Sequence, residues 1–413
     1  MNPLALFSAV TVEQVKEILK KHLEGYKPEI EEANLLQAYN RVLAEDIVSP
    51  EDIPAFNRST VDGFAVRARD TFGASESMPA LLTLVGEIRM GEQTEIKLST
   101  GEAAKIPTGG MLPECSDAVV MLEYTQLMDD TILCAEKPVA PKENVVEKGE
   151  DIKKGSVVLK KGHTLRPQDL GALAAVGIDR IKLVKPPAVS VISTGDEIKP
   201  PASSVKPGEV RDINTYAICG EVMKWGGLPL PQGIVRDNFE DLYDAVKAAL
   251  EKSHMVLLSG GSSVGARDHT VKVIESLGKP GVLAHGLPVK PGKPTVVAVV
   301  DGKPIIGLPG HPVSAMVIFE ILVRPIISTM LGRPEDFGGT RVYARMSRNI
   351  ASAAGRQDFI RVKLEQRGEE LWAVPVLGKS GLISNMVESH GLARIPSEKQ
   401  GVAEGELVEV EIY

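Results

Sequence analysis

The second half of the chain alternates between strand and helix patterns, and this alternation is the strongest constraint on the fold. Apolar runs typical of buried strands begin at Ala188, Leu228 and Met255. Between them, apolar residues recur at helical spacing over Ile213–Trp225 and Phe239–Leu250. Such an alternation predicts a doubly wound α/β domain, whose ligands bind at the loops that follow the strands.

Other patterns flank this domain. Thr11 and Gln14 form a capping-box pair that opens a helical pattern, and a second helix is expected over Leu35–Leu43. Over residues 57–140, and again after Gly332, short apolar runs are separated by turn residues. That pattern is typical of β structure.

The length of the chain indicates several domains. At about 150 residues per domain, 413 residues correspond to roughly three. A short helix that Pro167 opens follows the β-rich stretch and is expected to rejoin the N-terminal part, which makes the β-rich stretch an insertion. We therefore expect a first domain over residues 1–50 plus 145–185, an inserted β-rich domain over 51–144, the α/β domain over 186–332 and a terminal β domain over 333–413.

Composition and charge exclude several classes of function. Hydrophobic residues at 43% and charged residues at 25% are ordinary for a soluble globular protein, and a net charge of −8 without a basic block argues against nucleic acid. We saw no apolar run near the roughly eighteen residues of a membrane helix, and no secretion signal. Cys115, Cys134 and Cys219 lack disulfide or metal spacing, which fits a reducing cytoplasm.

A loop of glycine and serine follows the strand that begins at Met255. It reads Ser259-Gly260-Gly261-Ser262-Ser263-Val264-Gly265, and Asp268 lies at the start of the next helix. Glycines let the backbone approach a ligand, while hydroxyls and free N–H groups at a helix start bind anions. Ala266 and Arg267 stand where a Walker A loop has Lys and Ser or Thr. The loop therefore predicts an anion cradle of another kind; the alternative is a tight turn that only connects strand to helix.

Carboxylates follow the strands of the same domain. Glu197 comes after the first strand, where it could recognise ring N–H groups of a heterocycle or hold a metal, or lie in solvent while Asp196 caps a helix. Asp237 and Asp268 also follow strands. Paired carboxylates suit Mg²⁺ beside a phosphate, although either residue could equally be a helix cap.

A stiff basic loop, Lys290-Pro291-Gly292-Lys293-Pro294, presents two ammonium groups close together. An oxyanion is their natural partner, and the alternative is a solvated basic turn. Gly307–Ser314 is a rigid turn that leads into a helix and reads as scaffold. Histidines at zinc-ligand spacing, a GxSxG elbow and a nucleophilic cysteine signature are all missing from the sequence, which disfavours covalent catalysis.

Together these segments resemble the molybdopterin molybdenumtransferase (MoeA) family, which includes the E domain of gephyrin. The resemblance covers nearly the whole chain and implies an N-terminal linker domain, an inserted β-rich domain, a three-layer α/β domain and a C-terminal β-barrel, assembled as a homodimer. The segments that carry it are Ser59–Val66, Ile106–Gly109, Gly149–Ile152, Ser193–Glu197, Ser259–Asp268, Lys290–Pro294, Gly307–Ser314 and Ser380-Gly381.

The resemblance implies an enzyme that inserts molybdate into adenylylated molybdopterin and releases AMP, with Mg²⁺ assisting. It also implies roles for particular residues. The active crevice is reached across the dimer interface by Asp62 and Thr108, and catalysis also involves Asp151, Glu197 and Asp268. The metal is bound by Asp237 and Asp268, and molybdate is held by Lys290, Lys293, Arg356 and Ser380. The site is further lined by the Gly/Ser loop together with Thr194, Gly195, Pro309 and Pro312.

The expected partners are the small-molecule substrates, a second copy of the chain and other proteins of cofactor biosynthesis, with no nucleic acid and no membrane. Three positions depart from the usual family pattern. Gly286 stands where Lys is common, His311 where Asn is common, and Phe64 where Tyr is common. These departures leave the choice between molybdate and tungstate open.

Two alternatives compete with this interpretation. The α/β domain alone also resembles enzymes that adenylylate molybdopterin with ATP, the preceding step. A non-catalytic scaffold of the same fold is the other alternative, since gephyrin anchors receptors. The Asp62 and Thr108 motifs favour the transferase over the adenylylating enzyme, and a scaffold would be expected to carry a partner-binding extension or linker.

Overall fold

The computed structural model describes residues 10–260, 266–334 and 339–413, with the backbone alone at residues 266–268. It divides the chain into two compact units. The first holds Met1–Glu31, Asn40–Val42 and Leu183–Tyr413, and the second holds Glu32–Tyr39 and Leu43–Lys182. The finer division into four domains stays a prediction.

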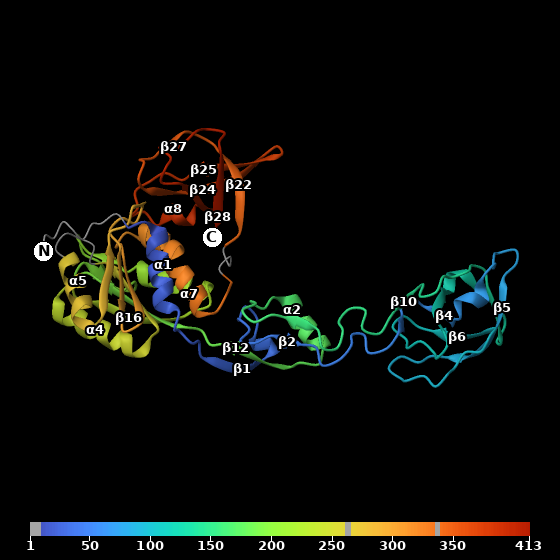
Figure 1. The fold of residues 1–413 in the computed structure, drawn as a ribbon. Coiled ribbons are helices and arrows are strands. Elements are labelled where there is room, and N and C mark those ends of the chain that lie inside the picture. The colour runs from blue at the N-terminus through green and yellow to red at the C-terminus, as the bar shows by residue number, and fades with distance from the viewer. Residues whose placement is uncertain (1–9, 261–265, 335–338) are drawn as a thin grey trace. The chain divides into compact units, whose positions relative to one another are not determined.

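A six-stranded sheet forms the centre of the first unit (Figure 1). Its strand order is β16-β13-β17-β21-β20-β18; the first four strands are parallel, β20 is antiparallel to β21, and β18 is antiparallel to β20. The bounds are β13 Ala188–Thr194, β16 Leu228–Val235, β17 Met255–Gly260, β18 Pro280–His285, β20 Val296–Val300 and β21 Lys303–Leu308.

Helices cover both faces of this sheet, which confirms the three-layer, doubly wound fold. α3 (Asn214–Lys224) connects β13 to β16 on one side, and α4 (Phe239–Lys252) returns from β16 to β17 on the other side. Right-handed crossovers in opposite directions place these two helices on opposite faces. α5 (Ala266–Leu277) packs beside α4, and α6 (Pro312–Ile318) packs beside α3. Leu242 and Val246 of α4 are buried against Ile192 and Leu258 of the sheet.

A continuous helical segment follows the last parallel strand. It consists of α6, the π-helix η5 (Phe319–Val323) and α7 (Arg324–Met330). Within the described part of the chain, Pro312–Met330 is the one helix long and apolar enough to span a membrane, with a mean hydropathy of 1.7. However, 78% of its most apolar window is buried inside the protein, as in the core helix of a globular domain.

Five strands near the C-terminus close into a β-barrel, as expected. Around the ring, β24 pairs with β25, β25 with β22, β22 with β28, β28 with β26, and β26 again with β24. β19 (Val289–Lys290) comes from the α/β part and pairs with β24, which places Lys290 opposite Asp358. The bounds are β22 Arg341–Met346, β24 Gln357–Arg367, β25 Glu370–Pro375, β26 Gly391–Ile395 and β28 Leu407–Ile412, with β23 Ile350–Ala351, β27 Gly401–Val402 and α8 Ser384–Val387 beside them.

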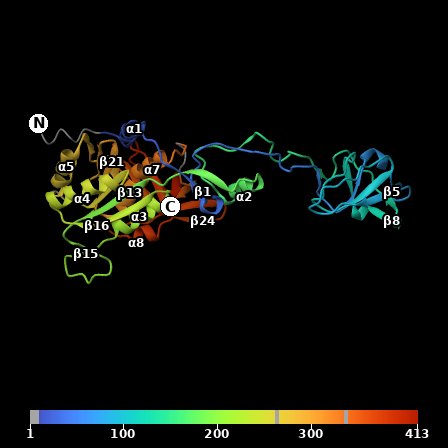
Figure 2. The same cartoon turned by 90° about the horizontal axis from the view of Figure 1, so that it is seen from below.

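The second unit contains the β-rich insertion, in which Figure 2 labels β5 and β8. Its sheet has the order β7-β4-β6-β5-β9-β8, and Phe64, Leu82, Val120 and Leu133 form its buried core. The bounds are β4 Gly63–Val66, β5 Ala80–Glu87, β6 Glu102–Ile106, β7 Ala118–Met121, β8 Thr125–Asp129 and β9 Ile132–Ala135, with short 3₁₀ turns η3 Ala68–Thr71 and η4 Leu122–Tyr124.

Short elements complete the two units. α1 (Val12–Leu23) begins at the expected Thr11/Gln14 capping box, and α2 (Pro167–Ala175) begins at Pro167 as expected. The helix expected over Leu35–Leu43 was wrong, because only the 3₁₀ turn η2 (Leu35–Gln37) forms and Asn40 adopts a positive φ of 61° that a helix cannot continue through. The remaining strands are β1 Ile30–Asn34, β2 Ile47–Val48, β3 Arg58–Ser59, β10 Val145–Val146, β11 Val157–Leu159, β12 Arg180–Val184, β14 Ile198–Lys199 and β15 Val210–Arg211.

Candidate active site

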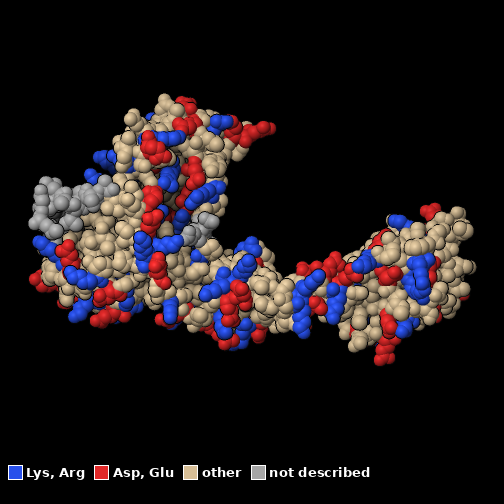
Figure 3. All heavy atoms as spheres, viewed as in Figure 1, with Lys and Arg blue, Asp and Glu red and all other residues tan. Residues whose placement is uncertain are grey.

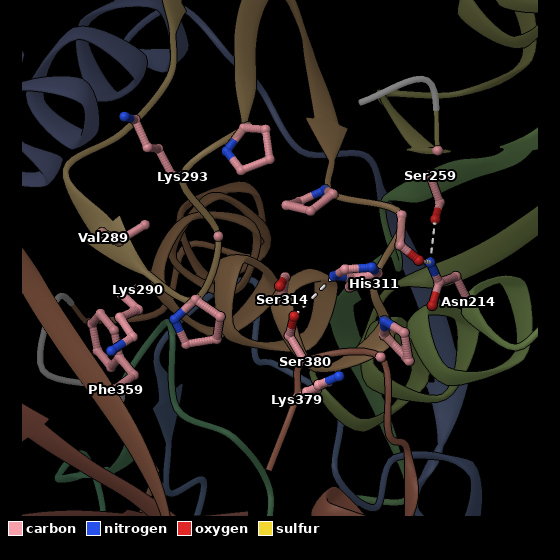
Figure 4. A pocket seen from close by; sticks show the side chains of 18 of the residues that line it. Asn214, Ser259, Val289, Lys290, Lys293, His311, Ser314, Phe359, Lys379 and Ser380 are labelled. Carbon is pink, nitrogen blue, oxygen red and sulfur yellow. Dashed lines mark hydrogen bonds between the residues drawn. The ribbon is translucent and has the colours of Figure 1, made fainter. Parts of the chain in front are cut away.

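A cavity of about 1470 Å³ opens in the first unit at the carboxyl ends of β13 and β17 (Figure 4). This is the edge at which open parallel sheets bind ligands. The basic loop 287–294, the start of α6 and barrel loops around residues 353–356 and 376–381 complete its wall. The cavity therefore joins the α/β sheet to the barrel within one compact unit.

Polar side chains form a hydrogen-bonded floor under the strand ends. Ser193 Oγ donates to Asp212 Oδ1 at 3.0 Å and lies 2.8 Å from Thr215 Oγ1. Asn214 Nδ2 donates to Ser259 Oγ at 2.7 Å and to the carbonyl oxygen of Gly310 at 2.9 Å. These bonds fix the start of α3 against β13, β17 and the turn that precedes α6.

Three oxygen atoms at this end of the cavity are buried without a hydrogen-bond partner among the described residues. They are Thr194 Oγ1, Asn214 Oδ1 and Asp237 Oδ1. The two hydrogen bonds that Asn214 Nδ2 donates fix the orientation of the amide group, so the atom left without a partner is its acceptor oxygen Oδ1. A buried polar oxygen without a partner is costly, so these atoms are available to bind a cation, water or the polar groups of a ligand.

Asp237 lies among other carboxylates. Burial is the main cause that raises the pKa of Asp237 above its usual value, and the negative charges of Asp196 and Glu197 raise it further, while His269 opposes the shift. The backbone N–H of Asp237 also points to Asp196 Oδ1 at 3.4 Å. A cation bound here would relieve this repulsion between carboxylates.

The residues at this end fit a magnesium ion only together with a ligand. Within the described residues, three or more Asp, Glu, His or Cys side chains do not gather as a metal-binding group. Asp237 nevertheless has a buried carboxylate oxygen without a partner in the described chain. Mg²⁺ often binds through one or two carboxylates plus phosphate oxygens and water, and a single carboxylate of this kind meets that pattern.

The opposite end of the cavity carries positive charge. Figure 4 shows Lys290 and Lys293 on one side, Asn214 and Ser259 on the other, and His311 with Ser380 between them. The loop needs glycine at position 292, because φ is +119° there and a Cβ would lie 2.6 Å from Ile318 Cδ1. Ile318 thus fixes the distance between the loop and α6.

A buried carboxylate holds two of the cations. Asp358 is fully buried at the start of β24, accepts from Arg356 Nε at 2.9 Å and lies 3.7 Å from Lys290 Nζ. The guanidinium of Arg356 is therefore already paired with a carboxylate. The role expected for Arg356 in binding molybdate stays a prediction, and its partner Asp358, two residues later, was not foreseen from the sequence.

Arg361 is a buried cation in the wall of the cavity. It is 8% exposed, and its NH2 group donates to the carbonyl oxygens of Val376 and Gly378 at 3.2 and 3.1 Å. Burial lowers its pKa. Its Nε lacks a partner, and it forms no ion pair with a carboxylate in the part of the chain that the structure describes. Sequence analysis missed it, because an arginine within a strand pattern gives no signal of its depth.

His311 and Ser380 join the two halves of the cavity. His311 Nδ1 lies 2.8 Å from Ser380 Oγ, and the N–H of Val313 donates to the carbonyl oxygen of Ser380 at 3.2 Å. Ser380 belongs to a barrel loop, while His311 precedes α6. Figure 4 shows the two side chains pointing toward each other.

The cavity brings together most of the expected site residues. Those that line it are Thr194, Gly195, Glu197, Asp237, Ser259, Gly260, Lys290, Lys293, Pro309, Pro312, Arg356 and Ser380. Gly261, Ser262, Ser263 and Gly265 lie outside the described residues, and Asp268 is described only as backbone of α5. The roles assigned to all of them stay predictions.

The other three expected residues belong to the second unit. Asp62 Oδ1 accepts from the backbone N–H of Thr108 at 2.7 Å and from its Oγ1 at 3.0 Å. These two bonds, the backbone one foremost, lower the pKa of Asp62. Asp151 is exposed, and its N–H donates to the carbonyl oxygen of Ile53 at 3.1 Å.

Family models match three consecutive stretches of the chain. Residues 10–177 match the MoeA N-terminal region (domains I and II), residues 190–329 a probable molybdopterin binding domain, and residues 343–413 the MoeA C-terminal region (domain IV). A putative molybdopterin biosynthesis protein of Methanocaldococcus jannaschii is 38% identical over 99% of this chain and 98% of that protein. The molybdopterin molybdenumtransferase of Haemophilus influenzae is 34% identical over 98% of both chains, and that of Bacillus subtilis is 32% identical over 92% of this chain and 89% of that protein.

Solved structures agree with these matches. A crystal structure of a molybdopterin biosynthesis MoeA protein from Pyrococcus horikoshii has a TM-score of 0.83 at 40% identity, covering 98% of this chain and 99% of that chain. A second MoeA structure from Pyrococcus horikoshii OT3 has a TM-score of 0.86 at 32% identity, covering 98% and 100%.

Proposed function

Since the chain belongs to the MoeA family, we propose that it is a molybdopterin molybdenumtransferase of molybdenum cofactor biosynthesis. In this reaction molybdate is inserted into adenylylated molybdopterin and AMP is released. One observation carries the proposal: a single cavity has buried oxygen atoms without a partner among the described residues at one end and the basic loop of Lys290 and Lys293 at the other, with the buried Arg361 also in its wall. Those two ends suit a heterocyclic substrate and an oxyanion, respectively.

We propose that the basic end holds molybdate. Molybdate is a tetrahedral dianion, and its capture needs fixed cations and hydrogen-bond donors. Lys290 and Lys293 lie on a proline-stiffened loop, Arg361 is a buried residue of the cavity wall, and Ser380 offers a hydroxyl group. Arg356 and Lys290 both lie beside Asp358, and we propose that Arg361 adds a further direct contact to theirs.

We propose that the oxygen-rich end holds the adenylate and its phosphates. Asn214 Oδ1 and Thr194 Oγ1 are suited to N–H or O–H groups of the substrate, and Ser259 and Gly260 lie where the phosphates would pass. Asp237, with Asp268, would hold Mg²⁺, which neutralises charge on a phosphoanhydride that is to be cleaved. The chain supplies no protein nucleophile in this scheme; its residues bind, orient and neutralise, while the dithiolene sulfurs of the substrate take up molybdenum.

We further propose that the enzyme acts as a homodimer in the cytoplasm. The family resemblance supports a role for Asp62, Thr108 and Asp151 in which they reach the cavity of a second copy of the chain. The hydrogen bonds from Thr108 keep the Asp62 carboxylate oriented and ionised, as such a role requires.

The direct test follows AMP release from adenylylated molybdopterin and Mg²⁺, with and without molybdate. The proposal expects AMP only when molybdate is present, together with activation of an apo-molybdoenzyme. If neither appears while ATP plus molybdopterin yields the adenylate, the protein catalyses the preceding step and the proposal is wrong.

A further inference from the structure

A short chain of hydrogen bonds runs through the turn that precedes α6 and connects both ends of the cavity. Asn214 Nδ2 donates a hydrogen bond of 2.9 Å to the carbonyl oxygen of Gly310. The next residue, His311, has its Nδ1 2.8 Å from Ser380 Oγ, and Val313 holds the Ser380 carbonyl at 3.2 Å. Ser380 is thus fixed twice, through its main chain and through its side chain (Figure 4).

The hydrogen bond between His311 and Ser380 can form in two directions, and they have opposite consequences. A serine hydroxyl has one proton. If Ser380 donates it to His311 Nδ1, the hydroxyl presents only lone pairs to the cavity, which repel an oxyanion. If Nδ1 carries the proton and donates to Ser380 Oγ, the hydroxyl proton is free to bind an oxyanion.

We infer that His311 is a positioning residue that keeps its proton on Nδ1 and thereby makes Ser380 a donor to the bound oxyanion. The inference rests on the proposed function, because it deepens the description of the same molybdate site. The imidazole is well placed for this task. Pro309 and Pro312 restrict the turn on both sides, and the ring already lies within hydrogen-bonding distance of Ser380 Oγ.

The surroundings explain why the orientation of one proton matters here. Lys290, Lys293 and Arg361 line the same cavity, and each of them can only donate hydrogen bonds. His311 is exposed and Ser380 half-buried, so water competes for the hydroxyl unless a neighbour fixes it. Fixing Ser380 as a fourth donor adds to the binding of a dianion without adding charge.

The test is a double-mutant cycle on molybdate binding and turnover. We expect Ser380→Ala and His311→Ala each to raise the KM for molybdate about 3–10-fold with a smaller change in kcat. In the double variant the increase should equal that of Ser380→Ala alone, because His311 acts through Ser380. His311→Asn should restore most of the affinity, since an asparagine amide can also donate to Oγ. His22→Ala, an exposed site on α1 outside the cavity, is the matched control and should leave KM unchanged.

A second measurement does not depend on the enzymatic activity. With all seven histidines ¹⁵N-labelled and His311 assigned from the His311→Asn spectrum, the Nδ1 signal of His311 should be that of a protonated nitrogen. Additive effects of the two substitutions, or an unprotonated Nδ1, would overturn the inference. A wild-type protein that shows this tautomer but no molybdate-dependent AMP release would instead overturn the proposed function.

Discussion

Gly260 approaches Thr194 so closely that a Cβ on residue 260 would lie 2.1 Å from the carbonyl oxygen of Thr194. The two residues end the neighbouring strands β17 and β13, where they are register partners. Gly260 also has a φ of +107°, which side chains rarely adopt. Glycine is therefore required at the point where the strands open into the cavity.

Gly260→Ala should consequently push the two strand ends apart and abolish most of the activity. We also expect a loss of stability of about 1–3 kcal/mol, measured by urea unfolding, from the strained backbone. Gly171→Ala is the matched control: it lies within α2, a Cβ there meets open space, and alanine should stabilise the helix slightly. Normal turnover by the Gly260 variant would contradict this account of the cavity.

Arg361→Met should raise the KM for molybdate about 10-fold to 100-fold, because a charged hydrogen-bond donor is lost. The same change should leave the thermal midpoint nearly unchanged, because removal of a buried charge offsets the loss of the hydrogen bonds to the carbonyl oxygens of Val376 and Gly378. Arg367→Gln on the same strand is the control, because Arg367 pairs with Glu365 at 2.8 Å outside the cavity. A lower midpoint with an unchanged KM would assign Arg361 a structural role.

Because the pKa of Asp237 is raised, we expect the substitution Asp237→Asn to increase stability and to decrease activity. A carboxyl group whose pKa is higher in the folded state destabilises the protein at every pH at which the unfolded group is ionised. Asp237→Asn should therefore raise the melting temperature at pH 7, and the gain should vanish as the pH falls below about 4, the usual range of aspartate. Turnover at pH 7 should fall and no longer respond to Mg²⁺. A melting temperature that drops at pH 7 would contradict the burial of an ionised Asp237.

Thr108 offers a test in the second unit. Thr108→Val removes the Oγ1 bond to Asp62 and keeps the backbone bond, while Thr108→Ser keeps both. We expect the valine variant to lose most of its kcat and the serine variant to retain it. The valine variant should also raise the pKa of Asp62 toward its usual value, which NMR titration of the carboxyl carbon can follow. Equal activities of the two variants would show that the hydrogen bond from Thr108 Oγ1 to Asp62 has no role in the reaction.

Much of the fold could be predicted from the periodicity of the sequence. The predictions that failed did so for physical reasons. The strands that begin at Ala188 and Met255 could be predicted because buried parallel strands are continuously apolar, whereas the strand from Leu228 lies at the sheet edge and is only partly buried. The helix expected after Leu35 fails at Asn40, whose positive φ leaves no trace in the hydrophobic pattern. β18 was missed because it begins with Pro280 and Gly281, residues that read as a turn.

The candidate site was accessible in part. Loop residues such as Lys290 and Gly260 were identified because glycine and proline chemistry is local in sequence. Arg361 and Asn214 were missed, since their importance comes from burial and from an unused atom that only the packed structure reveals. The ion pair between Arg356 and Asp358 also gave no signal in the sequence, although the two residues lie only two positions apart.

In the proposed function, one cavity holds molybdate at its basic end. The most direct measurement is anomalous diffraction from crystals grown with molybdate, recorded at the molybdenum absorption edge. We expect a single strong peak in the cavity within hydrogen-bonding distance of Arg361 and Ser380. The Arg361→Met variant should lose that peak. A peak elsewhere in the protein, or one that persists in the variant, would contradict it.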